Sequence, residues 1–184
     1  FCASSPTECR LPDAERYARL AIKLKTDFRE ARNTLGVVLI HEKRYDEAIS
    51  VLEPLANDIL YSRPEYAWGN LGWAYLVSGN ADKAIEALKR AVGLQPDFCV
   101  GSYRLGLAYE KKGDYRAARD AISRALETDH PECKGLQDAF ASRARLNLRL
   151  GDRDGARVDL EQCRKLGTST PAGRECNATL STLQ

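Results

Sequence analysis

The feature that most constrains the fold is a glycine-marked pattern that returns about every 34 residues. Gly72 and Gly106 lie 34 residues apart, and the same order of large and small residues surrounds each of them. Gly36 precedes Gly72 by 36 residues, and Ala144 holds the corresponding position 38 residues after Gly106. Such a period is typical of stacked supersecondary units, because one unit alone cannot bury its apolar face. The sequence therefore predicts a repeat architecture.

Each period reads as two amphipathic helices joined by a tight turn. Over residues 68–96, apolar residues recur at three- and four-residue steps, Gly79-Asn80 interrupts them, and Pro96 ends them. The order is carried by Trp68, Leu71, Gly72, Tyr75, Ala84, Leu88, Ala91 and Pro96. This order resembles the tetratricopeptide repeat. The resemblance implies an all-α tetratricopeptide repeat solenoid of about four to five helix pairs, in a right-handed superhelix with a C-terminal capping helix.

The repeats divide the chain into three parts. Residues 1–12 contain two Cys and two Pro with little periodicity, so they are predicted to form an N-terminal loop closed by a disulfide. Residues 13–166 are the predicted repeat domain, and residues 167–184 are the cap, where Pro171 suits the start of a last helix. The inserted residues fall near 57–64 and 130–136. In the first of these linkers, Tyr61 is expected to pack back between helix pairs.

The cysteines bear on the compartment and on the connectivity. The chain has six Cys and two His without any CxxC spacing, so a zinc site is not expected. The alternatives are buried thiols in a cytosolic repeat protein or disulfides in an oxidising compartment, and the even count near turns and helix ends favours disulfides. Pairing of sequence neighbours, chosen among fifteen connectivities, predicts Cys2–Cys9, Cys99–Cys133 and Cys163–Cys176.

Charge and motifs argue against several functional classes. Lys and Arg number 28 and Asp and Glu 26, a net charge of +2 with both signs spread along the chain, unlike the clustered basic face of a nucleic-acid-binding protein. No apolar run approaches the ~20 residues of a membrane span. No nucleophile elbow, phosphate-binding glycine loop or HExxH motif occurs. An enzyme, a cofactor and a bound metal are therefore not expected.

The first helix of each pair is predicted to line a concave face. Counting outward from the packed positions places these partner-binding residues there: Asn33, Val37 and Ile40 in the first pair, Tyr66, Asn70, Trp73 and Val77 in the second, and Tyr103, Arg104 and Leu107 in the third. The fourth pair presents Asp138, Arg145 and Arg149 instead. The alternative is that Tyr66 and Trp73 pack against the adjacent repeat. A groove this apolar predicts an amphipathic helix or an apolar strand as its guest.

One stretch resembles a narrower family. It consists of Ala31-Arg32-Asn33-Thr34-Leu35-Gly36, Lys43-Arg44-Tyr45-Asp46-Glu47-Ala48, Asp58-Ile59-Leu60-Tyr61 and Asn70-Leu71-Gly72. These segments are similar to A-R-N-x-x-G, G/K-R-Y-x-E-A, D-x-x-Y and N-x-G of the type IV pilus biogenesis lipoproteins, the pilotins of the PilF/PilW/Tgl group. The resemblance covers residues 13–166. The cysteines and the C-terminal cap depart from the pattern and suit a Tgl-like branch.

The family resemblance implies a function and a location. A pilotin is a non-enzymatic protein that binds subunits of the type IV pilus secretin and promotes their localisation and oligomerisation in the outer membrane, in support of motility. We therefore expect a monomer at the periplasmic face of the outer membrane, with its lipid anchor on residues upstream of Phe1, where a removed export signal is also expected. The alternative is a generic repeat scaffold or chaperone cofactor that binds another peptide.

Overall fold

The computed structural model describes residues 10–130, 133 and 135–183, and the structural statements that follow concern those residues. They form ten α-helices and no strand, which confirms the predicted all-α class. The helices are α1 (Leu11–Leu24), α2 (Arg29–His41), α3 (Tyr45–Ala56), α4 (Pro64–Val77), α5 (Ala81–Leu94), α6 (Cys99–Lys112), α7 (Tyr115–Glu127), α8 (Gln137–Arg149), α9 (Arg153–Lys165) and α10 (Pro171–Thr182). None of these helices is both long enough and apolar enough to cross a lipid bilayer.

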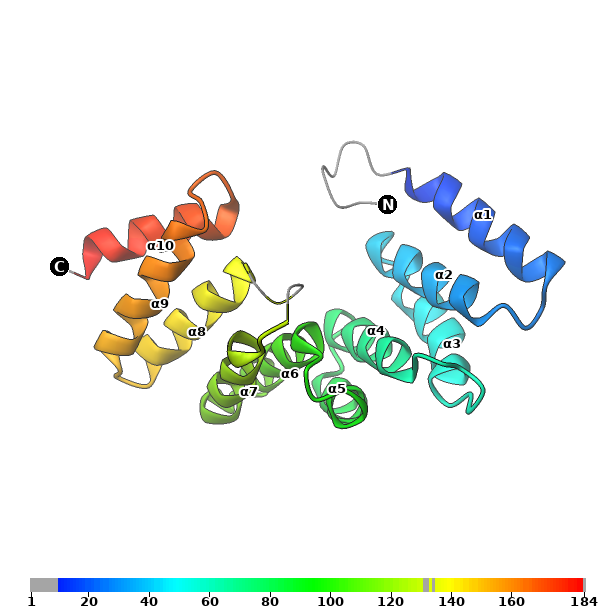
Figure 1. The fold of residues 1–184 in the computed structure, drawn as a ribbon, viewed down its shortest axis with the longest axis horizontal. Coiled ribbons are helices and arrows are strands. Elements are labelled where there is room, and N and C mark those ends of the chain that lie inside the picture. Colours follow the sequence, from blue (N-terminus) through cyan, green and yellow to red (C-terminus); the bar gives the residue numbers. More distant parts are fainter. Residues whose placement is uncertain (1–9, 131–132, 134, 184) are drawn as a thin grey trace. The chain divides into compact units, whose positions relative to one another are not determined.

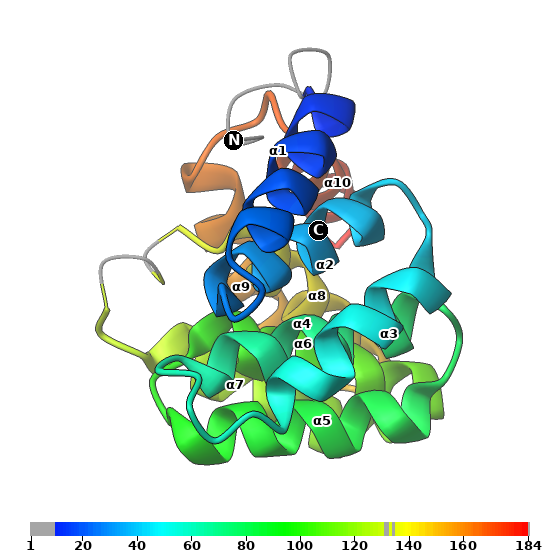
Figure 2. The same ribbon diagram turned by 90° about the vertical axis from the view of Figure 1, so that its right-hand side faces the viewer.

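The helices gather into two compact units, Phe1–Gln95 and Pro96–Gln184. In the first unit, α2 pairs with α3 and α4 pairs with α5, and α1 packs on α2 as the second helix of an incomplete pair (Figures 1 and 2). The core of this unit is aliphatic, with Leu39, Leu52, Leu71 and Leu88 at most 1% exposed. Burial of these side chains is the main stabilising term, at about 1.5–3 kcal/mol for each.

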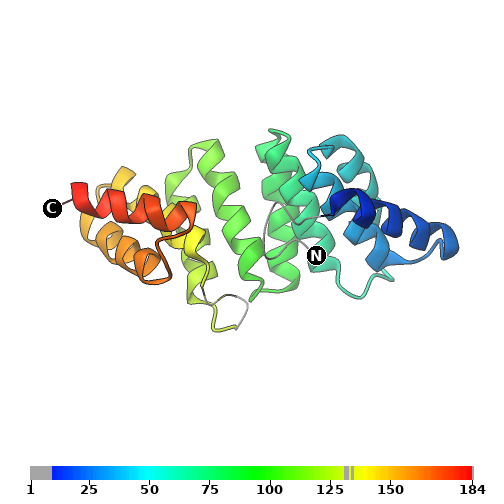
Figure 3. The same ribbon diagram turned by 90° about the horizontal axis from the view of Figure 1, so that it is seen from above.

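In the second unit, α6 pairs with α7 and α8 pairs with α9. The last helix, α10, contacts both α8 and α9 (Figures 1 and 3), so the predicted capping helix is present. It begins at Pro171 behind Thr170, whose hydroxyl accepts a hydrogen bond from the Gly173 amide at 3.0 Å. In the core that it shares with these helices, Leu160, Cys163 and Cys176 are at most 2% exposed.

The turn within each pair needs one residue in the left-handed region. Gly79, Gly113 and Gly151 supply it in three pairs, with φ between 81° and 94°. In the pair of α2 and α3 the same place is held by Lys43, at φ 62°. A side chain in this conformation has a steric cost that glycine avoids.

Three glycines let the two helices of a pair approach closely. A Cβ built on Gly106 would lie 2.4 Å from Ile122 Cγ1 and 2.9 Å from the Ala118 carbonyl oxygen. A Cβ built on Gly36 would lie 2.4 Å from Leu52 Cγ, and one built on Gly72 would lie 2.5 Å from Leu88 Cγ. These contacts explain the marker residue of the repeat: the partner helix occupies the space of its side chain.

Replacing Gly106 with Ala should therefore destabilise the second unit by about 1–3 kcal/mol. The higher helix propensity of Ala, worth about 1 kcal/mol, is outweighed because a backbone oxygen is among the clashing atoms. Gly93→Ala is the matched control, since a methyl group added to Gly93 in α5 would enter open space, and this change should be neutral or stabilising. Urea unfolding followed by circular dichroism measures both; equal midpoints for the two variants would contradict the steric explanation.

The linker between α3 and α4 is held by hydrogen bonds of Asp58 and by burial of Tyr61. Arg29 Nε donates to Asp58 Oδ2 at 2.7 Å, and the Leu60 amide donates to Asp58 Oδ1 at 2.9 Å. These two hydrogen bonds, that of Arg29 above all, lower the pKa of Asp58. Tyr61 is buried at 5% exposure, as predicted, whereas Ile59 is 96% exposed. The linker therefore has a defined conformation despite its inserted residues.

Two disulfides cross-link the second unit. Cys99 at the start of α6 joins Cys133 before α8, and Cys163 of α9 joins Cys176 of α10, with S–S distances of 2.02 and 2.01 Å. Both pairings are among those predicted from sequence adjacency. The third predicted pair, Cys2–Cys9, lies outside the described residues, as do residues 1–9 of the predicted loop over residues 1–12; Leu11 and Pro12 of that range belong to α1.

Candidate functional site

In the first unit, the predicted partner-binding residues come from α2 and α4, which contact each other (Figure 1). Asn70 Nδ2 of α4 donates a hydrogen bond to Asn33 Oδ1 of α2 at 3.0 Å. The sequence placed both residues on one face, and the structure brings them together. Val37, Tyr66, Trp73 and Val77 are half-buried, so each retains some accessible surface. We call this set, with Asn33 and Asn70, the α2–α4 face.

Ile40 differs from the other predicted residues of this face. It is only 7% exposed and belongs to the core of the unit, so it offers little surface to a partner. The periodicity of α2 places Ile40 one turn beyond Val37, but residues at that end of the helix are covered from more than one side: Val38 and Leu39 are buried too.

Tyr66 is held by a cation from the preceding loop. The Arg63 guanidinium lies over its ring, 4.0 Å from the centroid. This contact orients the ring, and it means that the α2–α4 face is not wholly apolar at its α4 N-terminal end. Among the described residues there is no group of three or more His, Cys, Asp or Glu side chains placed to hold a metal ion.

In the second unit, Tyr103 and Leu107 of α6 are half-buried. Tyr103 packs against the unit's own core, including Ile122 and Ala125, and its hydroxyl lies 3.5 Å from Ser142 Oγ. Burial raises the pKa of Tyr103. Much of this ring therefore supports the fold, so it has less surface for a partner than the sequence suggested.

Of the charged residues predicted for the second unit, Arg145 and Arg149 are exposed and Arg104 is half-buried. Arg145 forms ion pairs with Glu110 at 3.8 Å and with Glu175 at 3.3 Å, and Arg149 donates to the Tyr115 hydroxyl at 3.1 Å. Arg104 is half-buried, and this burial lowers the pKa of its guanidinium to about 10. It therefore stays protonated at neutral pH.

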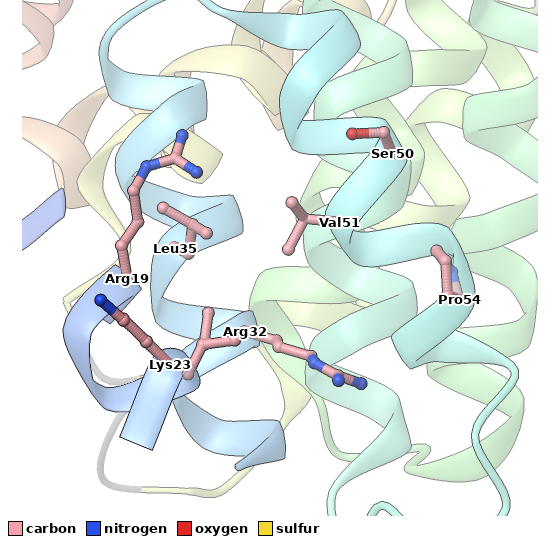
Figure 4. A pocket seen from close by; sticks show the side chains of 8 residues that line it. Arg19, Lys23, Arg32, Leu35, Ser50, Val51 and Pro54 are labelled. Carbon is pink, nitrogen blue, oxygen red and sulfur yellow. The ribbon is translucent and has the colours of Figure 1, made fainter. Parts of the chain in front are cut away.

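A cleft that sequence reasoning did not anticipate lies between α1, α2 and α3 (Figure 4). Its volume is about 520 Å³. It is lined by Arg19, Ile22, Lys23, Arg32, Leu35, Ser50, Val51 and Pro54. We call it the basic cleft. One signal of it was present in the sequence: Arg32 stands where the next repeat has the marker Trp68, 36 residues later.

Comparison with known proteins gives a consistent picture. Residues 65–98 and 103–163 each match the tetratricopeptide repeat family. The chain is 32% identical over 116 residues to BBSome complex member BBS4 of Bos taurus, an alignment that covers 63% of this chain and 22% of that protein. It is 30% identical over 123 residues to the heat-shock protein cognate co-chaperone sgt12 of Aspergillus fumigatus, which covers 67% of this chain and 33% of that one.

Among solved structures, Pseudomonas aeruginosa PilF has the same fold. Its TM-score is 0.73 at 21% identity, with 90% of this chain and 72% of PilF covered. At this identity the likeness concerns the fold alone. This chain spans about a fifth to a third of the length of the two curated relatives.

Proposed function

Because this chain belongs to the tetratricopeptide repeat family, whose members bind peptide segments of other proteins, we propose that it is a non-enzymatic pilotin. Its role would be to bind subunits of the type IV pilus secretin through the α2–α4 face and to promote their localisation and oligomerisation in the outer membrane. The observation that carries the proposal is the Asn33–Asn70 hydrogen bond at 3.0 Å. It joins the first helices of two successive pairs into one surface.

The side chains on that surface suit an apolar guest. Val37, Trp73 and Val77 are half-buried beside the two amides. Partly exposed aromatic and aliphatic groups gain from burial against a partner, and a central amide pair can fix the register of a bound backbone. An amphipathic helix or apolar strand of the secretin subunit fits this chemistry.

The proposed compartment is the periplasmic face of the outer membrane, with attachment through an N-terminal lipid. The two disulfides, Cys99–Cys133 and Cys163–Cys176, support an oxidising compartment because such bonds are rare in the cytosol. The segments that resemble pilotins, from Ala31 to Gly72, lie in the first unit, where the α2–α4 face is found. The PilF likeness supports only the fold that this function requires.

The second candidate is a repeat scaffold or chaperone cofactor with another peptide partner. The similarity to the co-chaperone sgt12 over 67% of this chain favours it. The same α2–α4 face would serve, so the two candidates differ in partner and compartment.

The double substitution Tyr66→Asp and Trp73→Asp should weaken binding of purified secretin subunits at least tenfold and prevent secretin multimers in cells. Two carboxylates on the α2–α4 face would lose their hydration when an apolar segment docks. Biolayer interferometry measures the affinity, and denaturant-resistant multimers on a blot measure assembly.

The matched control is Glu86→Lys with Lys89→Asp, a charge exchange on the exposed side of α5 that should leave both readouts unchanged. Circular dichroism must show equal helical content for all variants. Normal multimers with the Tyr66 and Trp73 variant would exclude this face as the secretin site. Absence of any secretin binding by the unaltered protein would instead favour the scaffold alternative.

A further inference from the structure

The basic cleft and a second cleft of the first unit occupy the same place in successive repeats. The second cleft lies between α3, α4 and α5 and is lined by Glu53, Asn57, Trp68, Leu71, Tyr75, Lys83, Glu86, Ala87 and Arg90. The repeat register pairs Arg19 with Glu53, Lys23 with Asn57, and Arg32 with Trp68. The two clefts can therefore be compared position by position, with the second serving as an internal reference.

In the second cleft, charged and polar side chains of the lining interact with one another. The Arg90 guanidinium lies 4.6 Å from the centroid of the Trp68 ring, and the Tyr75 hydroxyl donates to Glu53 Oε1 at 3.1 Å. Its lining contains two acidic and two basic side chains. With an indole at its centre, it retains about 240 Å³, less than half the volume of the basic cleft.

Among the described residues, the lining of the basic cleft contains neither an aromatic ring nor an acidic side chain. It includes three cations (Figure 4). Arg19 forms ion pairs with Glu15 at 2.7 Å and with Glu47 at 3.7 Å, and neither of these acidic residues lines the cleft. Arg32 donates to the Thr26 carbonyl oxygen, and within the part of the chain that the structure describes, neither Arg32 nor Lys23 forms an ion pair.

The floor between these cations is apolar. Ile22, Leu35 and Val51 come from three different helices and converge there, with Leu35 only 3% exposed. Arg32 and Leu35 lie on a different side of α2 from Asn33 and Val37, so the basic cleft is separate from the α2–α4 face. A ligand matched to this chemistry carries negative charge beside an apolar group.

We infer that the basic cleft is a second binding site, for an acidic peptide segment. One apolar side chain of the peptide contacts Ile22, Leu35 and Val51, and neighbouring Asp or Glu carboxylates pair with Lys23 and Arg32. A peptide fits better than a membrane surface, because a bilayer reaches the cations at the rim but not a floor set between three helices. The inference does not depend on the identity of the partner at the α2–α4 face.

The decisive variant is Arg32→Trp, which gives this repeat the residue found at the same place in the next one. The indole should fill the cleft as Trp68 fills its own, so the fold is retained while the site is closed. Lys23→Gln with Arg32→Gln is the second variant, which removes charge without filling space. Lys83→Gln, in the second cleft, is the control. Circular dichroism and thermal melting establish that each variant is folded.

The probe is an array of octapeptides with permuted Asp or Glu and Leu, Ile or Phe residues, beside a matched array in which every acidic residue is Asn or Gln. Acidic peptides selected from it are then measured in solution by fluorescence anisotropy. We expect at least tenfold weaker binding of the neutral counterparts and of both cleft variants, unchanged binding to Lys83→Gln, and weakening with added salt.

Several outcomes would overturn the inference: no acidic peptide binds above its neutral counterpart, Arg32→Trp binds as well as the unaltered protein, or only vesicles containing anionic lipid bind. The Tyr66→Asp and Trp73→Asp variant should still bind the acidic peptides. If it lost them together with the secretin, the two sites would be one.

Discussion

Replacing Asp159 with Ala is expected to destabilise the second unit by about 3–5 kcal/mol. Asp159 in α9 is 2% exposed, and its carboxylate accepts hydrogen bonds from Arg143 Nε at 2.9 Å and Nη2 at 2.6 Å. It also accepts one from Asn147 Nδ2 at 3.1 Å. Removal of the carboxylate leaves a largely buried guanidinium without its counter-charge and a buried amide without its acceptor, and both costs apply only to the folded state.

The environment of Asn147 adds to this effect. The Oδ1 atom of Asn147 is buried without a hydrogen-bond partner in the described structure. Loss of the Asp159 carboxylate would also remove the acceptor of the Asn147 Nδ2 group. Arg143 keeps one further acceptor, Ser123 Oγ at 3.1 Å, which is too little to replace a paired carboxylate.

Urea unfolding followed by circular dichroism measures the loss. Glu175→Ala is the control, because its carboxylate is 50% exposed and its only ion pair in the described structure, with Arg145, is 3.3 Å long; the change should stay within about 0.5 kcal/mol. Asp159→Asn, which keeps the shape and one acceptor, should fall between the two. A cost below about 1 kcal/mol for Asp159→Ala would show that this buried pair is not needed for the fold.

Removal of either disulfide is expected to destabilise the second unit by a comparable amount. In the chain-entropy account, opening the Cys163–Cys176 loop costs about 3 kcal/mol and opening the longer Cys99–Cys133 loop about 4 kcal/mol. The sequence separations are 13 and 34 residues. The longer loop therefore contributes more, because its closure restricts the unfolded chain more strongly.

Paired Cys→Ala variants of each bridge, measured by urea unfolding with and without dithiothreitol, test this. The reductant should lower the midpoint of the unaltered protein and of each single-bridge variant, and it should have no effect on the second unit once both bridges are removed. All four cysteines are at most 6% exposed, so some loss will come from packing. If reduction left the midpoint of the unaltered protein unchanged, the bridges would make no contribution to stability.

The elements of the fold were predictable because local rules and long-range packing agree in this sequence. Gly72 and Gly106 lie where the two helices of a pair approach most closely. In the structure, Leu88 and Ile122 occupy the space that a side chain at these positions would need. Cys99 begins α6, and Cys133 lies in the loop shortly before α8, so the bridge joins the starts of two adjacent repeats. Tyr61 is the aromatic residue of the insertion and is buried, whereas its apolar neighbours Ile59 and Leu60 are exposed.

The rest depends on information that periodicity does not contain. Asp159 lies in a helix rich in charge, and residue type alone would bury its neighbour Val158 instead, yet Val158 is 57% exposed and Asp159 only 2%. Ile40 was assigned to a surface by counting turns, but burial is set by every element that covers a helix end. The break between Gln95 and Pro96 is likewise invisible, because the step from Gly72 to Gly106 carries the ideal period across it.

The basic cleft could not be predicted from the sequence either. A departure from the repeat pattern at Arg32 was visible, yet its meaning depends on Arg19, Lys23 and Val51, which come from two other helices. Only the assembled unit shows that the departure leaves an unfilled space whose described lining holds three cations and no acidic side chain.

The Cys99–Cys133 bridge also has a mechanical consequence. If the two ends of the chain were pulled apart, tension would pass directly from one sulfur atom to the other and bypass α6 and α7. A stretch of 34 residues, roughly 110–120 Å of extended polypeptide, would then add nothing to the stretched length. If the protein bound a partner that was being pulled, the bridge would therefore keep the repeat of α6 and α7 from being stretched.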